Sequence, residues 1–266
     1  MKNIKFIPLF ATVFVMFSFL LTSCFQDLEQ DLALGDYPDG YDGAENLGDQ
    51  GETFYMSFET ADFMELVSEN DAILEGSPTV VSGKIGNALQ CSTTAFLKYS
   101  RTSLTTNLGN EFSATFWYKM GSASRAGILT CGKDNTAHDE RKFGFRFFRE
   151  GSATAQRFKL NMGNGTAEVY ADGGTAADRD PAIGWIHIAF VIAEGRCAVY
   201  IDGTLVKEST FTGAISWDGC TEISIGSGAP TFTVWSHLSD DSQIDELRMF
   251  NKALTEAQIN ELYSLR

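Results

Sequence analysis

Two tryptophans lie in segments whose composition suits ligand binding. Trp235 begins a polar stretch (WSHLSDDSQ) that also contains His237, and Trp217 lies in the short sequence ISWDG. Sugar-binding sites place an aromatic plane beneath a sugar ring and surround it with side chains that donate and accept hydrogen bonds. Trp217, Trp235 and His237 are therefore candidate ligand contacts. The simpler alternative is that Trp235 plugs one end of the fold.

A basic and aromatic cluster gives a second candidate, in the sequence RKFGFRFFR at residues 141–149. If this segment is a strand, alternation places Phe143, Phe145 and Phe147 on one face and Arg146 and Phe148 on the other. Arg146 and Phe148 could then hold an acidic sugar through paired hydrogen bonds and stacking. The alternative is a solvated face whose cations pair with neighbouring acids.

The first residues have the pattern of an export signal. Lys2 and Lys5 precede sixteen uncharged residues, which is typical of a secretory signal and short for a membrane span. The following Leu-Thr-Ser-Cys24 resembles the lipobox of bacterial lipoproteins. That resemblance implies a diacylglycerol on the sulfur of Cys24, cleavage before Cys24 and acylation of the new amino group. The alternative is an ordinary signal peptide with a chance cysteine.

An acidic segment follows the signal. Nine acidic residues and no Lys or Arg lie between Phe25 and Glu52, with glycine recurring among them. A segment of low hydrophobicity and one sign of charge gains too little burial to offset its ordering entropy, which predicts a flexible tether. Acids soon after a lipidated cysteine also resemble the surface-export signal of Bacteroidetes lipoproteins. We therefore expect residues 1–23 to be a signal peptide, 24–51 a tether, and the protein to be displayed on the cell outer membrane.

Charge and cysteine usage exclude several classes of function. The formal charge of −15 becomes −17 when Lys2 and Lys5 are removed with the signal, which argues against nucleic-acid binding. Neither Cys-x-x-Cys nor His-x-x-x-His spacing occurs, so a zinc site has no support. The four cysteines after Cys24 could pair in an exported protein. We expect them instead to be mostly free, buried thiols.

Residues 52–266 have the pattern of one all-β domain. Short apolar segments alternate with Gly, Asn, Asp and Ser, which predicts a β-sandwich or barrel. Strands are expected at 54–58, 96–99, 112–120, 127–131, 143–148, 158–162, 185–192, 197–201, 204–211, 222–225 and 244–250. Asp202-Gly203 predicts a hairpin turn, and the capping-box sequence from Thr255 to Gln258 predicts a short terminal helix.

Four segments resemble the laminin-G-like branch of the concanavalin A-like lectin and glucanase superfamily. They are GKIGNAL at 83–89, FSATFWYK at 112–119, GWIHIA at 184–189 with VYIDG at 199–203, and IDELRMFNKALT at 244–255. The resemblance implies a jelly-roll sandwich of two antiparallel sheets, with ligands on a concave face or on rim loops. In some relatives two acids hold a structural calcium, for which Glu59 and Asp245 are the candidates here.

Catalysis has little support in the sequence. Retaining glucanases of this superfamily use two carboxylates about 5–5.5 Å apart, supplied by a Glu-x-Asp-x-x-Glu pattern on one strand. No such pattern follows residue 52. The sequence therefore favours a non-catalytic, lipid-anchored binding protein that captures a glycan. The alternatives are an adhesion module for an envelope or host protein, and a glycoside hydrolase or lyase with an unrecognised site.

Overall fold

The computed structural model describes residues 51–101, 108–133 and 141–264. They belong to one compact unit, Asp49–Arg266. The unit Met1–Gly48, which contains the predicted signal and Cys24, lies outside the described residues. Within the described part of the chain, no helix combines the length and the apolar character needed to cross a membrane.

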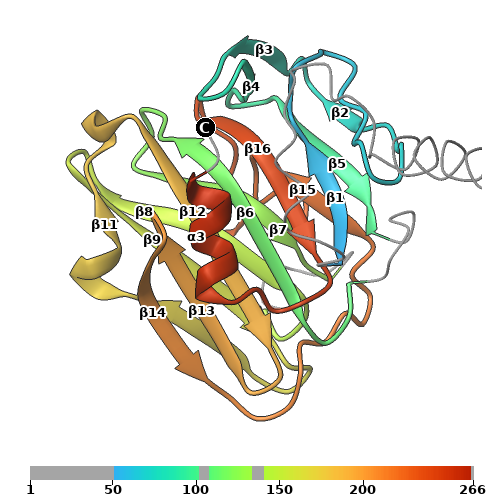
Figure 1. Ribbon diagram of the computed structural model, residues 1–266, viewed down its shortest axis with the longest axis vertical. Helices are drawn as coiled ribbons and strands as arrows, with labels where there is room; N and C mark the ends of the chain where they lie inside the picture. Colours follow the sequence, from blue (N-terminus) through green and yellow to red (C-terminus); the bar gives the residue numbers. More distant parts are fainter. Residues whose placement is uncertain (1–50, 102–107, 134–140, 265–266) are drawn as a thin grey trace, which may run out of the picture. The chain divides into compact units, whose positions relative to one another are not determined.

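The described residues of the domain form two antiparallel sheets of eight strands each and one α-helix (Figure 1). Sheet I contains β1 (Glu52–Met56), β3 (Thr79–Ser82), β4 (Asn87–Gln90), β6 (Phe112–Lys119), β12 (Trp185–Ala193), β13 (Arg196–Ile201), β14 (Thr204–Thr210) and β16 (Gln243–Phe250). Their order is β14-β13-β12-β6-β16-β4-β3, with β1 also paired to β16. The helix, α3 (Glu256–Ser264), lies against the outer side of this sheet.

Sheet II forms the second layer. It contains β2 (Ile73–Glu75), β5 (Phe96–Ser100), β7 (Arg125–Cys131), β8 (Phe145–Ser152), β9 (Ala155–Gly163), β10 (Glu168–Asp172), β11 (Asp178–Arg179) and β15 (Glu222–Ile225). The order is β10-β9-β8-β7-β15-β5-β2, and β11 pairs with β9. The predicted sandwich with a terminal helix is therefore confirmed.

Phenylalanine fills much of the space between the sheets. Phe147 of sheet II stacks on Phe190 of sheet I with ring centroids 5.0 Å apart, and Phe116 packs edge-on against Phe147. All three side chains are almost completely buried. Because alternate residues of a strand face opposite ways, the same strands direct their remaining side chains outward. On β8 these outward side chains are Arg146, Phe148 and Glu150, which become important for the candidate site.

Both faces of β12 are buried, which agrees with a sequence that is largely apolar on both faces of the strand. Its inner face joins the core, and its outer face is covered by α3. There the rings of Trp117, His187 and Tyr263 contact one another at 5.2–5.8 Å. Trp117 is thus buried beneath the helix on the outer side of sheet I, rather than between the two sheets.

The local signals for the hairpin and the helix are also confirmed. Asp202 and Gly203 both have positive φ, at 50° and 73°, as a type I′ turn requires. At the start of α3, Gln258 N donates to Thr255 Oγ1 and Thr255 N donates to Gln258 Oε1, which is the reciprocal pattern of a capping box. The four cysteines of the described domain are buried and form no disulfide with one another: Cys91, Cys131, Cys197 and Cys220.

Replacing His187 with phenylalanine is expected to reduce sensitivity to acid. Burial lowers the pKa of His187 to about 3, so below pH 6.5 the unfolded chain binds a proton that the folded protein does not. This contribution to stability is therefore complete above about pH 6.5 and is lost at about 1.4 kcal/mol per pH unit below it. The free energy of unfolding of the wild type should fall by about 2 kcal/mol between neutral pH and about pH 5 because of His187, and the His187→Phe variant should not show this loss. Urea unfolding of both proteins across this pH range measures the effect. The same pH dependence of the unfolding free energy in the variant and the wild type would contradict the prediction.

Candidate functional site

The candidate site lies on the outer face of sheet II, where a long loop crosses the strands. We call residues 226–239, between β15 and β16, the covering loop. Gly127 N on β7 donates to the carbonyl of Leu238 at 3.0 Å, and Thr130 Oγ1 donates to the carbonyl of Ser227 at 3.1 Å. Over β8, the ring of Phe148 lies 4.4 Å from that of His237. The loop is thus fixed to the sheet by backbone and aromatic contacts.

Two of the predicted ligand residues, Arg146 and Phe148, lie under this loop, and a third, His237, is part of it. Arg146, Phe148 and His237 are 1%, 4% and 2% exposed. The guanidinium of Arg146 lies 5.3 Å from the ring centroid of Phe232, and Arg146 Nη1 donates to Asn161 Oδ1 at 3.3 Å. Burial lowers the pKa of Arg146 to about 10. Because the loop covers Arg146 and Phe148, these two side chains support it rather than offer a ligand surface. Their predicted contacts with an acidic sugar are not compatible with this packing.

Trp235 lies on the loop in a different setting, since its side chain is 62% exposed. Trp235 and Ser236 both adopt positive φ, at 65° and 59°, which non-glycine residues rarely do. Arg125 Nη1 donates to the Trp235 carbonyl at 3.1 Å. Backbone strain of this kind persists where surrounding contacts hold it, often at functional sites. The result is a large aromatic surface open to solvent beside Arg125.

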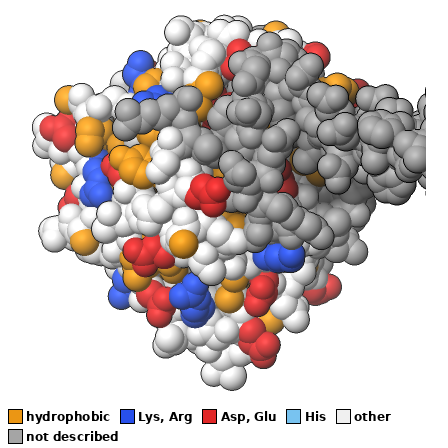
Figure 2. All heavy atoms as spheres, in the orientation of Figure 1, with side chains coloured by type: hydrophobic (Ala, Val, Ile, Leu, Met, Phe, Trp, Pro, Cys, Tyr) orange, Lys and Arg blue, Asp and Glu red, His pale blue; other side chains and the backbone are white. Residues whose placement is uncertain are grey.

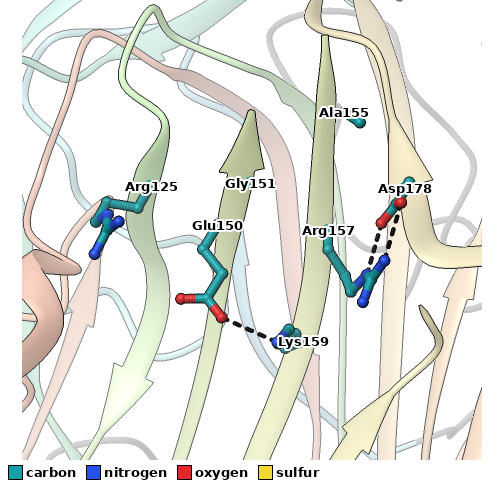
Figure 3. Close-up of a pocket in the computed structure, with 7 residues that line it drawn as sticks. All are labelled: Arg125, Glu150, Gly151, Ala155, Arg157, Lys159 and Asp178. Atoms are coloured by element: carbon teal, nitrogen blue, oxygen red, sulfur yellow. Dashed lines mark hydrogen bonds and ion pairs between the residues drawn. The ribbon is translucent and has the colours of Figure 1, made fainter. Parts of the chain in front are cut away.

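A cavity of about 360 Å³ lies next to this position. It is lined by Arg125 of β7, Glu150 and Gly151 of β8, Ala155, Arg157 and Lys159 of β9, and Asp178 of β11. Figure 3 shows the charged side chains projecting from neighbouring strands into one region. Two bonds join the cavity to the covering loop, because Arg125 holds the Trp235 carbonyl and Glu150 Oε2 lies 3.1 Å from His237 Nε2. The backbone of Trp235 is therefore attached to the lining of the cavity.

Ion pairs fix the charged side chains of the cavity. Figure 3 shows Arg157 bound to Asp178 through two hydrogen bonds, which measure 2.7 and 3.1 Å. Lys159 Nζ lies 2.9 Å from both Glu150 and Asp172. Burial opposes ionisation of Glu150, but hydrogen bonds from Lys159 and His237 outweigh it and the pKa is lowered. The hydrogen bonds from Arg157 lower the pKa of Asp178. Both carboxylates are therefore ionised acceptors at neutral pH.

The opposite face of the domain differs in character. On the side that carries α3, Figure 2 shows acidic and basic side chains in small interspersed groups among neutral surface. The charged cavity and the exposed Trp235 belong to sheet II instead.

Trp217 lies away from the cavity. Its ring packs edge-on against Phe112 and Phe145 at 6.0 Å, and its Nε1 donates to the carbonyl of Gly109 at 2.9 Å. Phe145 begins β8 and Glu150 lies five residues further along it, a distance of about 17 Å at the rise of a strand. Trp217 is therefore a packing residue at the other end of the sandwich, and the structure does not bring it to Trp235.

Glu59 and Asp245, the predicted calcium ligands, hold the same turn. Asp245 Oδ2 accepts the N–H of Lys84 at 2.8 Å, and Glu59 Oε1 accepts the N–H of Asn87 at 3.0 Å. Asp245 Oδ1 is buried without a hydrogen-bond partner in the described structure, which leaves one acceptor suited to a cation. Calcium takes six to eight oxygen ligands. Over the described residues no group of three or more Asp, Glu, His or Cys side chains is arranged so that it could hold a metal ion, so calcium at this turn stays a prediction.

The sequence reasoning missed most of the cavity. Arg157 and Lys159 alternate along β9, and Glu150 lies directly opposite Arg157 in the register with β8. Charges at alternate positions on adjacent strands were the available signal. They were not singled out because the same pattern describes an ordinary solvated face.

Comparisons with known proteins agree with this architecture. The family model described as "Concanavalin A-like lectin/glucanases superfamily" matches residues 92–260. Domain 4 of AbnA, a GH43 extracellular arabinanase from Geobacillus stearothermophilus, solved in complex with arabinotriose, has a TM-score of 0.61 at 20% identity. The match covers 80% of this chain and 98% of that domain.

Two further solved structures share the fold over shorter parts of their own length. The binding domain of botulinum neurotoxin DC, in complex with rat synaptotagmin II, has a TM-score of 0.56 at 14% identity, covering 81% of this chain and 52% of that one. Trypanosoma rangeli sialidase has a TM-score of 0.55 at 14% identity, covering 80% and 32%. No curated protein matches the sequence. The family model covers more than half of the chain, and the chain belongs to the concanavalin A-like lectin/glucanases superfamily.

Proposed function

We propose that this protein is a non-catalytic, lipid-anchored glycan-binding protein whose site combines Trp235 with the cavity on sheet II. The observation that carries the proposal is an exposed tryptophan fixed beside a cavity of ion-paired donors and acceptors. An aromatic face supports the apolar side of a sugar ring. Arg and Lys donate to hydroxyl oxygens, and ionised Glu and Asp accept from hydroxyl hydrogens. The arabinotriose complex of the structurally similar arabinanase domain is consistent with such a ligand.

The charges in the cavity argue against hydrolysis. Glycoside hydrolases need one carboxylic acid that keeps its proton near neutral pH and a second, ionised carboxylate. The pKa values of Glu150 and Asp178 are both lowered, by ion pairing and hydrogen bonding. Neither carboxylate suits the role of general acid. A role in binding a glycan therefore fits Glu150 and Asp178 better than a role in hydrolysing it.

Trp235→Ala is expected to weaken glycan binding by at least about tenfold, because it removes the aromatic surface, and central aromatic contacts usually contribute more than 1.4 kcal/mol. A glycan array followed by titration calorimetry measures the loss. Trp217→Phe is the matched control, since it alters packing at the far end of the sandwich and should leave affinity within about twofold. Failure of the wild type to bind any glycan, or equal affinity of Trp235→Ala and the wild type, would refute the proposal.

Membrane attachment rests on Cys24 and the preceding apolar signal. Several acyl chains on one cysteine give stable anchoring, whereas one chain is marginal. In detergent phase partitioning, the wild type should enter the detergent phase and Cys24→Ser the aqueous phase, while Ser23→Ala remains with the wild type. Surface display at the outer membrane is tested by protease treatment of intact cells, and complete protection would contradict it.

A second candidate, adhesion to an envelope or host protein, is favoured by a different surface. Met64, Val67, Ile73 and Leu74 are large apolar side chains between 37% and 50% exposed, and the last two lie on β2 at the edge of sheet II. Exposed apolar side chains gathered at a sheet edge are a recurrent feature of protein interaction sites. A protein partner whose affinity is lost on Leu74→Asp and unchanged by Trp235→Ala would establish this alternative over the glycan site.

A further inference from the structure

We propose that the cavity on sheet II selects uncharged glycans over carboxylated ones. This inference rests on the proposed function, and it concerns the chemical class of the sugar.

The first step is the charge balance of the site. Arg125, Arg157 and Lys159 supply three positive charges, and Glu150, Asp172 and Asp178 supply three negative charges. Arg157 and Lys159 both contact carboxylates within 4 Å, so those two cations are already neutralised. A site with no net charge lies in a chain of formal charge −15, which gives an anionic ligand no long-range attraction.

His237 does not change this balance. Its Nε2 lies 3.1 Å from Glu150 Oε2, and the positive charge of Arg125 opposes its protonation. Burial and Arg125 lower its pKa, and they outweigh the opposing influence of Glu150. His237 is therefore neutral at pH 7, and it provides no additional positive charge behind the cavity.

The second step is the hydrogen-bonding capacity that the ion pairs leave. Arg157 has five N–H donors, and two of them bind Asp178. Each carboxylate oxygen has two lone-pair directions, and Glu150 uses one oxygen for Lys159 and the other for His237. The cavity therefore still presents both donors and acceptors. A sugar hydroxyl can donate and accept at once, so it binds such a surface without breaking an ion pair.

The third step is the cost of an anion in the same place. The carboxylate of an oxidised sugar can only accept hydrogen bonds. It must therefore use the N–H donors left on Arg157, whose charge Asp178 already neutralises, or those of Arg125. In the described structure Arg125 forms no ion pair, and its Nη1 is held by the Trp235 carbonyl. Three protein carboxylates share this small cavity and its rim, close enough that their charges act on a bound anion at ordinary salt. Three cations lie among these carboxylates, so a bound anion meets no net attraction that would offset the loss of its hydration.

The test compares matched glycans. A neutral glycan that binds on the array is oxidised at its primary hydroxyls to carboxylates, and a portion is then methyl-esterified to restore neutrality. At about 0.01 M salt, where the screening length is about 30 Å, the oxidised glycan should bind at least about tenfold more weakly. The difference in affinity between the neutral and the oxidised glycan should be smaller at about 1 M salt, where the screening length is about 3 Å. The methyl ester should recover most of the affinity.

Two variants with the same charge change locate the cause. Asp178→Asn leaves Arg157 without its bidentate partner. It should reduce the ratio of the affinities for the neutral and the oxidised glycan by at least about threefold. Asp218→Asn removes one acid from an exposed site elsewhere, paired with Lys133, and should leave this ratio unchanged. An ester as weak as the acid, or equal effects of the two variants, would overturn the electrostatic explanation and with it the inference. Preferential binding of acidic glycans would overturn the inference alone, whereas failure to bind any glycan would overturn the proposed function as well.

Discussion

Arg149→Met should destabilise the domain by about 3–5 kcal/mol, the range expected when one partner of a buried ion pair is removed. Arg149 and Asp240 are 0% and 3% exposed and form a direct ion pair. Arg149 also donates to Tyr118 Oη at 3.0 Å and to Gln156 Oε1 at 2.7 Å. Methionine keeps much of the length of the side chain but leaves Asp240 as a buried charge without its cation. Urea unfolding at pH 7 measures the loss.

The consequence extends to the candidate site because Asp240 directly follows the covering loop. Its Oδ1 accepts hydrogen bonds from the N–H and the hydroxyl of Ser242, which fixes the chain between the loop and β16. The Arg149→Met variant should therefore bind glycan more weakly even at temperatures where it remains folded.

A double variant separates charge from packing. In Arg149→Met/Asp240→Asn both charges are absent, and the asparagine oxygen can still accept from Ser242. This protein should be more stable than Arg149→Met alone, because the uncompensated charge is gone. A single variant that loses less than about 1 kcal/mol would show that the pair does not anchor this end of the sandwich.

Much of the fold could be predicted because it depends on local patterns. All eleven expected strands are present, since alternation along β6 and β8 and the apolar sequence of β12 reflect burial directly. The terminal helix followed from its capping box, and the hairpin from Asp202-Gly203. The strands that were not predicted, β2, β3, β4, β10 and β11, are two to five residues long, and most lie at sheet edges. Short segments with one paired side carry little periodic signal, so their pairing depends on neighbours.

The candidate site was predictable only in part, for a related reason. Trp235 was identified from an aromatic residue in a polar loop, and it is exposed beside the cavity. Alternation correctly places Arg146 and Phe148 on the outer face of β8, but no local pattern indicates that the covering loop buries them. The carboxylates that form ion pairs with Arg157 and Lys159 come from three other strands, β8, β10 and β11. Such a constellation becomes visible only when the sheet order is known.

Replacement of Gly127 by alanine should displace the covering loop and thereby remove glycan binding. An ideal Cβ on Gly127 would lie 2.2 Å from Gly228 N and 2.7 Å from the carbonyl oxygen of His237, both of which are backbone atoms. Gly127 N also donates to the Leu238 carbonyl, so the loop rests directly on this strand. Backbone cannot move aside as a flexible side chain does. We expect overpacking of about 1–3 kcal/mol and a loss of affinity of at least about tenfold, because His237 and Trp235 shift together.

Gly109→Ala is the matched control for this substitution. Nothing lies within 4 Å of a Cβ at Gly109, and its φ is not in the left-handed region, so its stability and affinity should stay within about 0.5 kcal/mol of the wild type. Urea unfolding and calorimetry with the same glycan compare the two variants. If Gly127→Ala retains full affinity, the position of the covering loop does not determine binding, and the site must lie on another surface. Loss of affinity in Gly127→Ala that exceeds its loss of stability would instead identify the contact between β7 and the loop as the element that holds Trp235 beside the cavity.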